Sequence, residues 1–285
     1  MKRSRDFFLY AVAHVDELPE PVRAAFQAHP TTGDSAIIVI PPQEYGVLRM
    51  NWLRILPFAR RTTPQRTLLI TDEQIIIVET EDAAPNTIVI PVQNIIYIGL
   101  GVILLYAYLE LVWVHNDQIN TIKIEFNSVG ESIIRSQITR TRTILVRQHS
   151  TAGRGKLASI MHGFPFKFQG YLGYSLLRNE QLLGAVYQPA LRDSHRWRRT
   201  YLSPNRVVAV TDRSLIILED PDSGPVSQYG IVTRFIPMSR IQEITFDHEQ
   251  GQSQMNVMLG IGNTLQNLSI PLDAQNAHVL QEQCD

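Results

Sequence analysis

The chain has 285 residues, of which 44% are hydrophobic and 19% are charged, and its formal net charge is -1. This composition is typical of a folded protein with room for two domains, and it argues against general disorder. The near-neutral charge provides no basic field for phosphates, so we expect no nucleic-acid partner. Cys284 is the only cysteine, which excludes an intrachain disulfide and a cysteine-based zinc site and fits a cytoplasmic setting.

The first strongly patterned segment in chain order belongs to an internal repeat. Residues 64–79, PQRTLLITDEQIIIVE, recur as residues 204–219, PNRVVAVTDRSLIILE, with seven of sixteen positions identical. Each copy has two aliphatic and β-branched runs around a Thr-Asp step, which predicts a β-hairpin. We expect Asp72 and Asp212 to favour the turns, because an Asp side chain can bond to the backbone that follows it.

Residues 95–114, IIYIGLGVILLYAYLELVWV, carry a single charge and are long enough for a membrane-spanning helix. The repeat argues against that helix. Residues 88–98 match residues 234–244, and extending the match pairs 95–114 with 241–260, which is too polar to cross a bilayer. The common interpretation of both stretches is a β-hairpin.

In the first copy this hairpin is predicted to have one strand to about Ile98, a turn near Gly99 and Gly101, and a second strand from about Ala107. Its tip is apolar where the tip of the second copy is polar. We expect packing against the other domain or a second chain to cover it, with shallow membrane insertion as the alternative. The candidate residues for this apolar contact are Leu100, Val102, Ile103, Leu104 and Leu105.

The end of each copy reads as a strand followed by a helix. Residues 121–134 match residues 267–280, and alternating apolar residues in both predict a half-buried strand. Asp273 is a good N-cap for the second helix. In the first helix, Ile134, Ile138, Thr141 and Leu145 recur at helical spacing and form one buried face.

The polar, Gly- and Ser-containing stretch 147–159 separates the copies and reads as a linker or a frayed helix end. We therefore predict two domains. The first covers residues 1–150, with a repeat core at about 44–148. The second covers residues 151–285, with a linker and a repeat core at about 178–285.

The repeat resembles the bacterial pleckstrin-homology-like domains and the related GRAM modules. The motifs are VTDRSLIILE followed by IPMSRIQEI in the second copy, and ITDEQIIIVE followed by IPVQNIIYI in the first, where Glu73 replaces a usual Arg. The resemblance implies a mainly β fold with C-terminal capping helices. It implies two seven-stranded, bent antiparallel sandwiches or partly open barrels in tandem, with opening strands at about 42–56 and 180–192.

The same resemblance implies a place for a headgroup site, because lipid-binding members hold phosphorylated headgroups in a basic loop between their first two strands. Arginine side chains suit phosphate oxygens. The alternative interpretation is a solvated loop whose arginines pair with carboxylates, and neither loop has the full basic order of the phosphoinositide binders. The candidates are Arg192, His195, Arg196, Arg198 and Arg199 in the second copy and, more weakly, Arg54, Arg60 and Arg61 in the first.

The sequence contains no recognisable catalytic motif and no His or Cys pair at metal-ligand spacing, so we expect no metal and no cofactor. The leading hypothesis is a cytoplasmic, non-enzymatic binding or scaffold module, with a protein partner or a second copy of itself. The alternative is a peripheral module that binds anionic phospholipid headgroups at the inner face of the membrane. An enzyme without a recognisable motif is third.

Overall fold

The computed structural model describes most of the chain and divides it into two compact units. Unit 1 comprises Met1–Gln93, Leu105–Tyr108 and Ile124–Gln137, and unit 2 comprises Asn94–Leu104, Leu109–Lys123 and Ile138–Asp285. Unit 2 therefore contains segments of both repeat copies. The predicted domain boundary at residues 150 and 151 lies outside the described residues, which are 7–29, 34–47, 50–51, 54–55, 59–80, 85–146, 160–192, 201–221, 229–249 and 252–284.

Unit 1 is built on an antiparallel sheet with strand order β1-β2-β7-β8-β9. Helix α1 (Glu20–Gln27) begins with Pro in its first turn and packs Val22 and Phe26 into a core with strand residues such as Ile76. The strands are β1 (Tyr10–Val12), β2 (Ala36–Ile40), β7 (Gln65–Ile70), β8 (Gln74–Thr80) and β9 (Asn86–Pro91).

The opening strand of the first copy lies earlier than predicted. It is β2, because Ala36–Ile40 pairs with β7. The predicted segment 42–56 instead belongs to an extension of the β2–β7 hairpin, since Pro41 and Pro42 interrupt the strand and cannot donate ladder hydrogen bonds. That extension consists of β3 (Glu44–Val47) paired with β6 (Ala59–Thr62) and β4 (Met50–Asn51) paired with β5 (Arg54–Ile55).

The hairpin predicted at residues 64–79 is confirmed as β7 and β8, and the side chain of Thr71 bonds within its turn. The Thr71 hydroxyl oxygen accepts hydrogen bonds from the backbone N–H of Glu73 at 3.3 Å and of Gln74 at 3.0 Å. The same hydroxyl donates to the Gln74 carbonyl at 2.9 Å. One side chain therefore satisfies most of the turn.

The second copy repeats this turn between β16 (Arg206–Thr211) and β17 (Ser214–Glu219). The Thr211 hydroxyl accepts from the backbone N–H of Arg213 at 3.1 Å and of Ser214 at 2.7 Å. Asp212 points elsewhere and accepts the backbone N–H of Gln181 at 2.7 Å. The threonine therefore makes the same hydrogen bonds in the turns of both copies.

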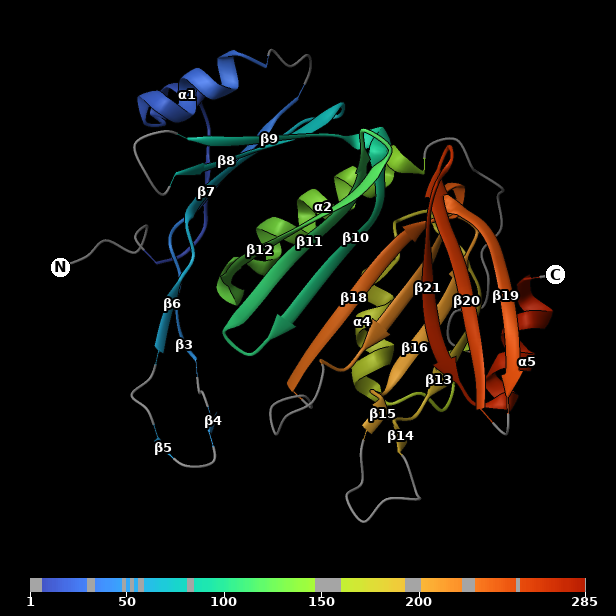
Figure 1. Ribbon diagram of the computed structural model, residues 1–285. Coiled ribbons are helices and arrows are strands. Elements are labelled where there is room, and N and C mark those ends of the chain that lie inside the picture. Colours follow the sequence, from blue (N-terminus) through green and yellow to red (C-terminus); the bar gives the residue numbers. More distant parts are fainter. Residues whose placement is uncertain are drawn as a thin grey trace. The chain divides into compact units, whose positions relative to one another are not determined.

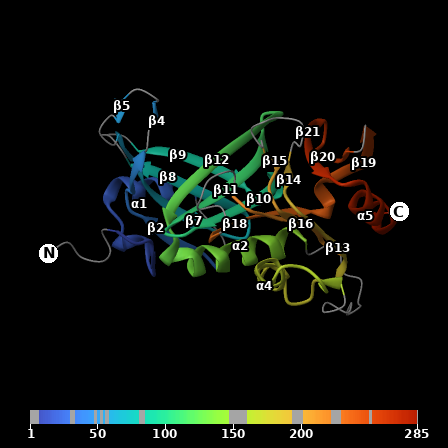
Figure 2. The ribbon, with the colours of Figure 1, turned by 90° about the horizontal axis from the view of Figure 1, so that it is seen from below.

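A seven-stranded antiparallel sheet, largely in unit 2, contains strands from both copies in the order β12-β11-β10-β18-β17-β16-β13. Helix α4 (Phe166–Ser175) lies against one face of it (Figure 2), and its Phe168 and Leu172 are buried. The strands not yet given are β10 (Ile95–Ile103), β11 (Tyr106–His115), β12 (Gln118–Asn127), β13 (Leu182–Gln188) and β18 (Gly230–Pro237).

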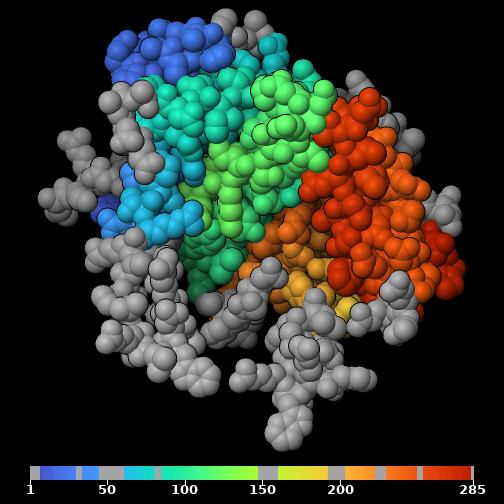
Figure 3. All heavy atoms as spheres, viewed as in Figure 1, coloured from blue at the N-terminus to red at the C-terminus, as the bar shows by residue number. Residues whose placement is uncertain are grey.

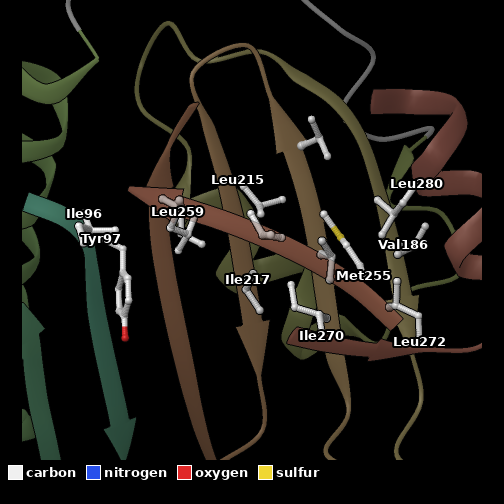
Figure 4. Packing of buried hydrophobic residues seen from close by; sticks show 14 of the residues in the cluster. Ile96, Tyr97, Val186, Leu215, Ile217, Met255, Leu259, Ile270, Leu272 and Leu280 are labelled. Atoms are coloured by element: carbon white, nitrogen blue, oxygen red, sulfur yellow. The ribbon is translucent and has the colours of Figure 1, made fainter. Parts of the chain in front are cut away.

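A three-stranded sheet, β19 (Ile241–Glu249), β20 (Gln252–Ile261) and β21 (Thr264–Leu272), covers the other face, and β20 and β21 form a continuous surface in the space-filling view (Figure 3). Between the two sheets lies one hydrophobic core (Figure 4). Ile96, Tyr97, Val112 and Val114 of the first copy belong to this core together with residues of the second copy such as Ile217, Met255 and Leu272.

Both predicted helices are confirmed. Helix α2 (Glu131–Leu145) buries Ile134, Ile138 and Thr141 as expected. Helix α5 (Ala274–Cys284) is capped by Asp273, whose carboxylate accepts the backbone N–H of Asn276 at 2.7 Å. The chain is thus mainly β with C-terminal helices, and its sheets of five, seven and three antiparallel strands are not closed barrels.

The apolar stretch 95–114 forms two strands, so the possibility of a membrane-spanning helix there is wrong. The predicted turn position is also wrong, because β10 runs through Gly99 and Gly101 and the turn lies at Leu104 and Leu105. Leu104 has a positive φ of 53°. Within the described part of the chain, no helix combines the length and apolar character needed to cross a membrane.

Candidate functional site

The repeat junction, defined as Ile98–Ile103 of β10 and Gly230–Phe235 of β18, is the place where the two copies share a sheet (Figure 1). The strands pair antiparallel with Ile98 opposite Phe235 and Ile103 opposite Gly230. Gly230 permits this close approach, since a Cβ there would lie 2.8 Å from the carbonyl oxygen of Val102. The edge of a strand in the first copy is thus occupied by a strand of the second.

Charged side chains cross one face of the sheet at the repeat junction. Arg234 of β18 forms an ion pair with Glu219 of β17, and Arg206 of β16 contacts the same carboxylate at 3.1 Å. Arg206 also donates to the carbonyl of Pro271 at 3.2 Å. One carboxylate thus pairs with two arginines across three neighbouring strands.

The absence of a side chain at Gly99 leaves room for Glu110 of the first copy beside this network. Gly99 lies opposite Arg234, and a Cβ at Gly99 would be 3.1 Å from both Cβ and Oε2 of Glu110 on β11. Burial lowers the pKa of Arg234, but Glu219, Tyr97 and Glu110 outweigh burial and the net pKa shift is upward. The guanidinium therefore stays charged.

Tyr97 lies beside the same charges, and its pKa is raised to about 12 by burial and by the adjacent Glu110 carboxylate, against the opposing effect of Arg234. Its phenol keeps its proton at neutral pH. Tyr97 and Arg234 therefore act as fixed hydrogen-bonding groups, and the arrangement suits cohesion of the sheet rather than proton transfer.

On the opposite face, α2 contributes Arg142, which is almost fully buried. Its Nη2 lies 2.9 Å from Oε2 of Glu180, whose side chain is 0% exposed, and its guanidinium lies 4.0 Å from the ring centroid of Phe235. Glu180 also accepts the Thr211 hydroxyl at 2.7 Å and the backbone N–H of Leu177 at 2.9 Å. A helix from the first copy is thereby joined to the turn of the second.

Sequence reasoning missed these groups. Arg142 follows Thr141 on the buried side of α2. An arginine beside a predicted apolar helix face could have indicated a buried charge that needs a partner. Glu219 had a signal in the repeat, because the predicted hairpin places it opposite Arg206, as it places Glu79 opposite Arg66 in the first copy. No comparable signal marks Glu180, because only the tertiary fold brings it to Arg142.

Most of the predicted headgroup residues of the second copy, His195, Arg196, Arg198 and Arg199, lie outside the described residues. The backbone of Arg192 lies in β14 (Leu191–Arg192), which pairs with β15 (Tyr201–Ser203). Whether these residues meet at one site stays a prediction.

In the first copy, Arg54 lies in β5, and Arg60 and Arg61 are neighbours in β6. Arg61 is exposed and lies 3.5 Å from the carboxylate of Glu125, which also accepts the Tyr106 hydroxyl at 2.8 Å. Arg61 therefore has a carboxylate partner, as the solvated-loop interpretation expects.

The candidate apolar tip divides into two parts. Leu100 and Val102 are buried, opposite Thr233 and Ile231 respectively, so residues of the same chain cover them. Ile103 is half-buried. Leu104 and Leu105 are 54% and 71% exposed at the turn and form the remaining apolar surface.

Among the strands that end their sheets in the described part of the chain are β9 in unit 1 and β19 in unit 2. A groove of about 470 Å³ runs along β19, lined by Ile241–Phe246 and by Gln281 of α5. A second hollow, of about 800 Å³, lies in unit 1 and is lined in part by Phe7, Phe8 and Gln43.

The described residues contain no group of three His, Cys, Asp or Glu side chains that could hold a metal ion. No protein-family model matches the chain, and no curated protein matches it either.

Proposed function

We propose that this chain is a non-enzymatic binding or scaffold module, built of two pleckstrin-homology-like domains in tandem, that associates with itself or with other proteins through its sheet edges. The observation that carries the proposal is the repeat junction. There the chain already uses the edge of one repeat's strand, β10, as the docking surface for a strand of the other repeat.

The strand edges of β9 and β19 support the same function. An unpaired edge presents a row of backbone N–H and C=O groups, and a second strand satisfies them without any specialised side chain. The groove along β19 provides open space beside such an edge. Backbone pairing supplies the affinity, and the side chains that alternate on each face determine which partner fits.

The charges at the repeat junction support binding rather than catalysis. Arg206 and Arg234 share the carboxylate of Glu219, and Tyr97, whose pKa is raised to about 12, keeps its proton at neutral pH. These groups stabilise strand pairing between repeats, which is the kind of contact that the proposed function uses.

Size-exclusion chromatography with multi-angle light scattering tests the proposal on the full chain over a wide range of concentrations. Self-association predicts a mass that rises above that of the monomer as concentration increases. A monomer mass at every concentration, together with sedimentation with anionic vesicles, would contradict it and favour the peripheral membrane alternative.

A further inference from the structure

The repeat allows each strand of one copy to be matched with its counterpart in the other. The match of residues 88–98 with 234–244 makes β9 the counterpart of β18, and it makes β10 the counterpart of β19. The structure supports this assignment. In both copies the strand ends at a proline, Pro91 or Pro237, and a 3-10 turn of three residues leads into the next strand.

These four strands allow two equivalent pairings, β10 with β18 and β19 with β9, and one chain uses only the first. The β10 edge of the first copy is joined to the β18 edge of the second. The counterpart edges, β19 in the second copy and β9 in the first, end their sheets among the described strands. Each chain therefore carries one completed joint, and its edge strands include the counterparts of the two strands that form this joint.

We infer that β19 of one chain pairs with β9 of a second copy and so repeats the junction between chains, head to tail. The inference rests on the proposed function and specifies that the binding partner is a second copy of the chain. Transferring the register of the repeat junction places Ile244 opposite Val89, Thr245 opposite Ile88, Phe246 opposite Thr87 and Asp247 opposite Asn86. Because the two surfaces differ, the contact leaves an open end on each chain and builds rings or filaments rather than closed dimers.

Two of the four pairs in this register match those of the repeat junction, whereas Thr245 opposite Ile88 and Asp247 opposite Asn86 replace pairs that contain a glycine. Ile98 opposite Phe235 becomes Ile244 opposite Val89, an apolar pair in both cases. Leu100 opposite Thr233 becomes Phe246 opposite Thr87, a large apolar residue facing a threonine in both. Since side chains alternate strictly along strands, a register shifted by one residue would lose both matches.

The accessibility of the two strands also fits. In β19, Ile244 and Phe246 point toward the core, while Thr245 and Asp247 are exposed. The backbone of the strand lies next to the groove. Strand β9, NTIVIP, carries no charge that would blunt its edge. On β19, the charges of Glu243 and Asp247 oppose non-specific pairing with other strands. The joint between chains is therefore weaker than the joint within a chain, and its formation depends on concentration.

Proline substitutions block one edge at a time. Of two successive residues in an edge strand, one directs its N–H outward, so each edge is tested at two positions. The β9 edge is blocked with Thr87→Pro or Ile88→Pro, and the β19 edge with Ile244→Pro or Thr245→Pro. The variant of each pair that keeps the melting temperature of the wild type is used, and Asn267→Pro on the β21 edge is the matched control.

Light scattering on these variants gives a pattern specific to a head-to-tail joint. The wild type and Asn267→Pro form species larger than dimers, whereas each edge-blocked variant alone is monomeric. An equimolar mixture of the two edge-blocked variants forms one-to-one heterodimers and nothing larger, because the mixture has one intact β19 and one intact β9. A homodimer of the β9-blocked variant would overturn the inference in favour of symmetric β19 pairing.

Cross-linking tests the register independently in a Cys284→Ser background. A chain with Thr245→Cys mixed with a chain with Ile88→Cys should form a disulfide-linked heterodimer, whereas Thr245→Cys mixed with Asn267→Cys should not. Oligomers that persist in both edge-blocked variants would overturn this joint and leave self-association intact. A wild type that is monomeric at every concentration would overturn self-association as well.

Discussion

Arg142 of α2 and Glu180 form an ion pair with 2.9 Å between Nη2 and Oε2, and the two side chains are 4% and 0% exposed. Arg142 comes from the first repeat copy, and Glu180 comes from the segment that leads into β13 of the second. Because both charges are withdrawn from water, each depends on the other for its solvation. The pair therefore makes unit 2 dependent on residues from both copies.

Replacing Arg142 with alanine should lower the free energy of unfolding by about 3 to 5 kcal/mol, because it leaves the carboxylate of Glu180 buried without its charged partner. Urea denaturation measures the change. Arg135→Ala in the same helix is the control, since Arg135 pairs with Glu131, one helical turn away, and both side chains are partly exposed. The control should cost only about 0.5 kcal/mol, and equal losses in both variants would contradict the assignment.

The second repeat copy should not fold alone. A fragment of residues 160–285 lacks Ile96, Tyr97, Val112 and Val114 from its core and exposes the β18 edge. We expect it to bind a hydrophobic dye and to unfold without a cooperative transition. A fragment of residues 94–285 restores the missing strands and should melt cooperatively. A cooperative melt of 160–285 at the temperature of the full chain would show that the shared core is dispensable.

Tyr97 should make stability depend on pH in the alkaline range. Its pKa is about 12 in the folded chain against 10.0 as the ordinary value, so its contribution is complete below pH 10 and is lost as pH rises to about 12. The two-unit difference corresponds to about 3 kcal/mol. Denaturation at a series of pH values should show a steeper alkaline loss for the wild type than for Tyr97→Phe. Tyr174→Phe, at an exposed position, should behave as the wild type.

The membrane alternative makes a separate prediction about the basic loop. If anionic headgroups bind there, changing Arg196, Arg198 and Arg199 to Glu should abolish sedimentation with anionic vesicles at low salt, because it reverses three charges. Vesicles of neutral lipid are the control for non-specific binding. Wild-type protein that stays in the supernatant with anionic vesicles would reject this function.

Much of the local structure follows from the sequence alone. The repeat, the strand pattern of residues 64–79 and 204–219, and the amphipathic face of α2 depend on neighbours close in the chain, where periodicity and turn chemistry act directly. The sequence locates the Thr-Asp turns, but the carboxylate of Asp212 accepts the backbone N–H of Gln181, outside its own turn. The hydroxyls of Thr71 and Thr211 do the bonding, because each reaches two N–H groups of its own turn.

Only the tertiary structure decided how the copies share strands. The sequence predicts that β10 and β18 exist. It does not predict that they pair, because strand edges pair through backbone groups that nearly every residue carries. The apolar character of Leu100 and Val102 required a cover, and the fold shows that β18 of the same chain lies beside them. Likewise, Arg142, Glu180, Arg234 and Glu219 become ion pairs only when the fold brings distant segments together, since a charge pair depends on distance in space rather than along the chain.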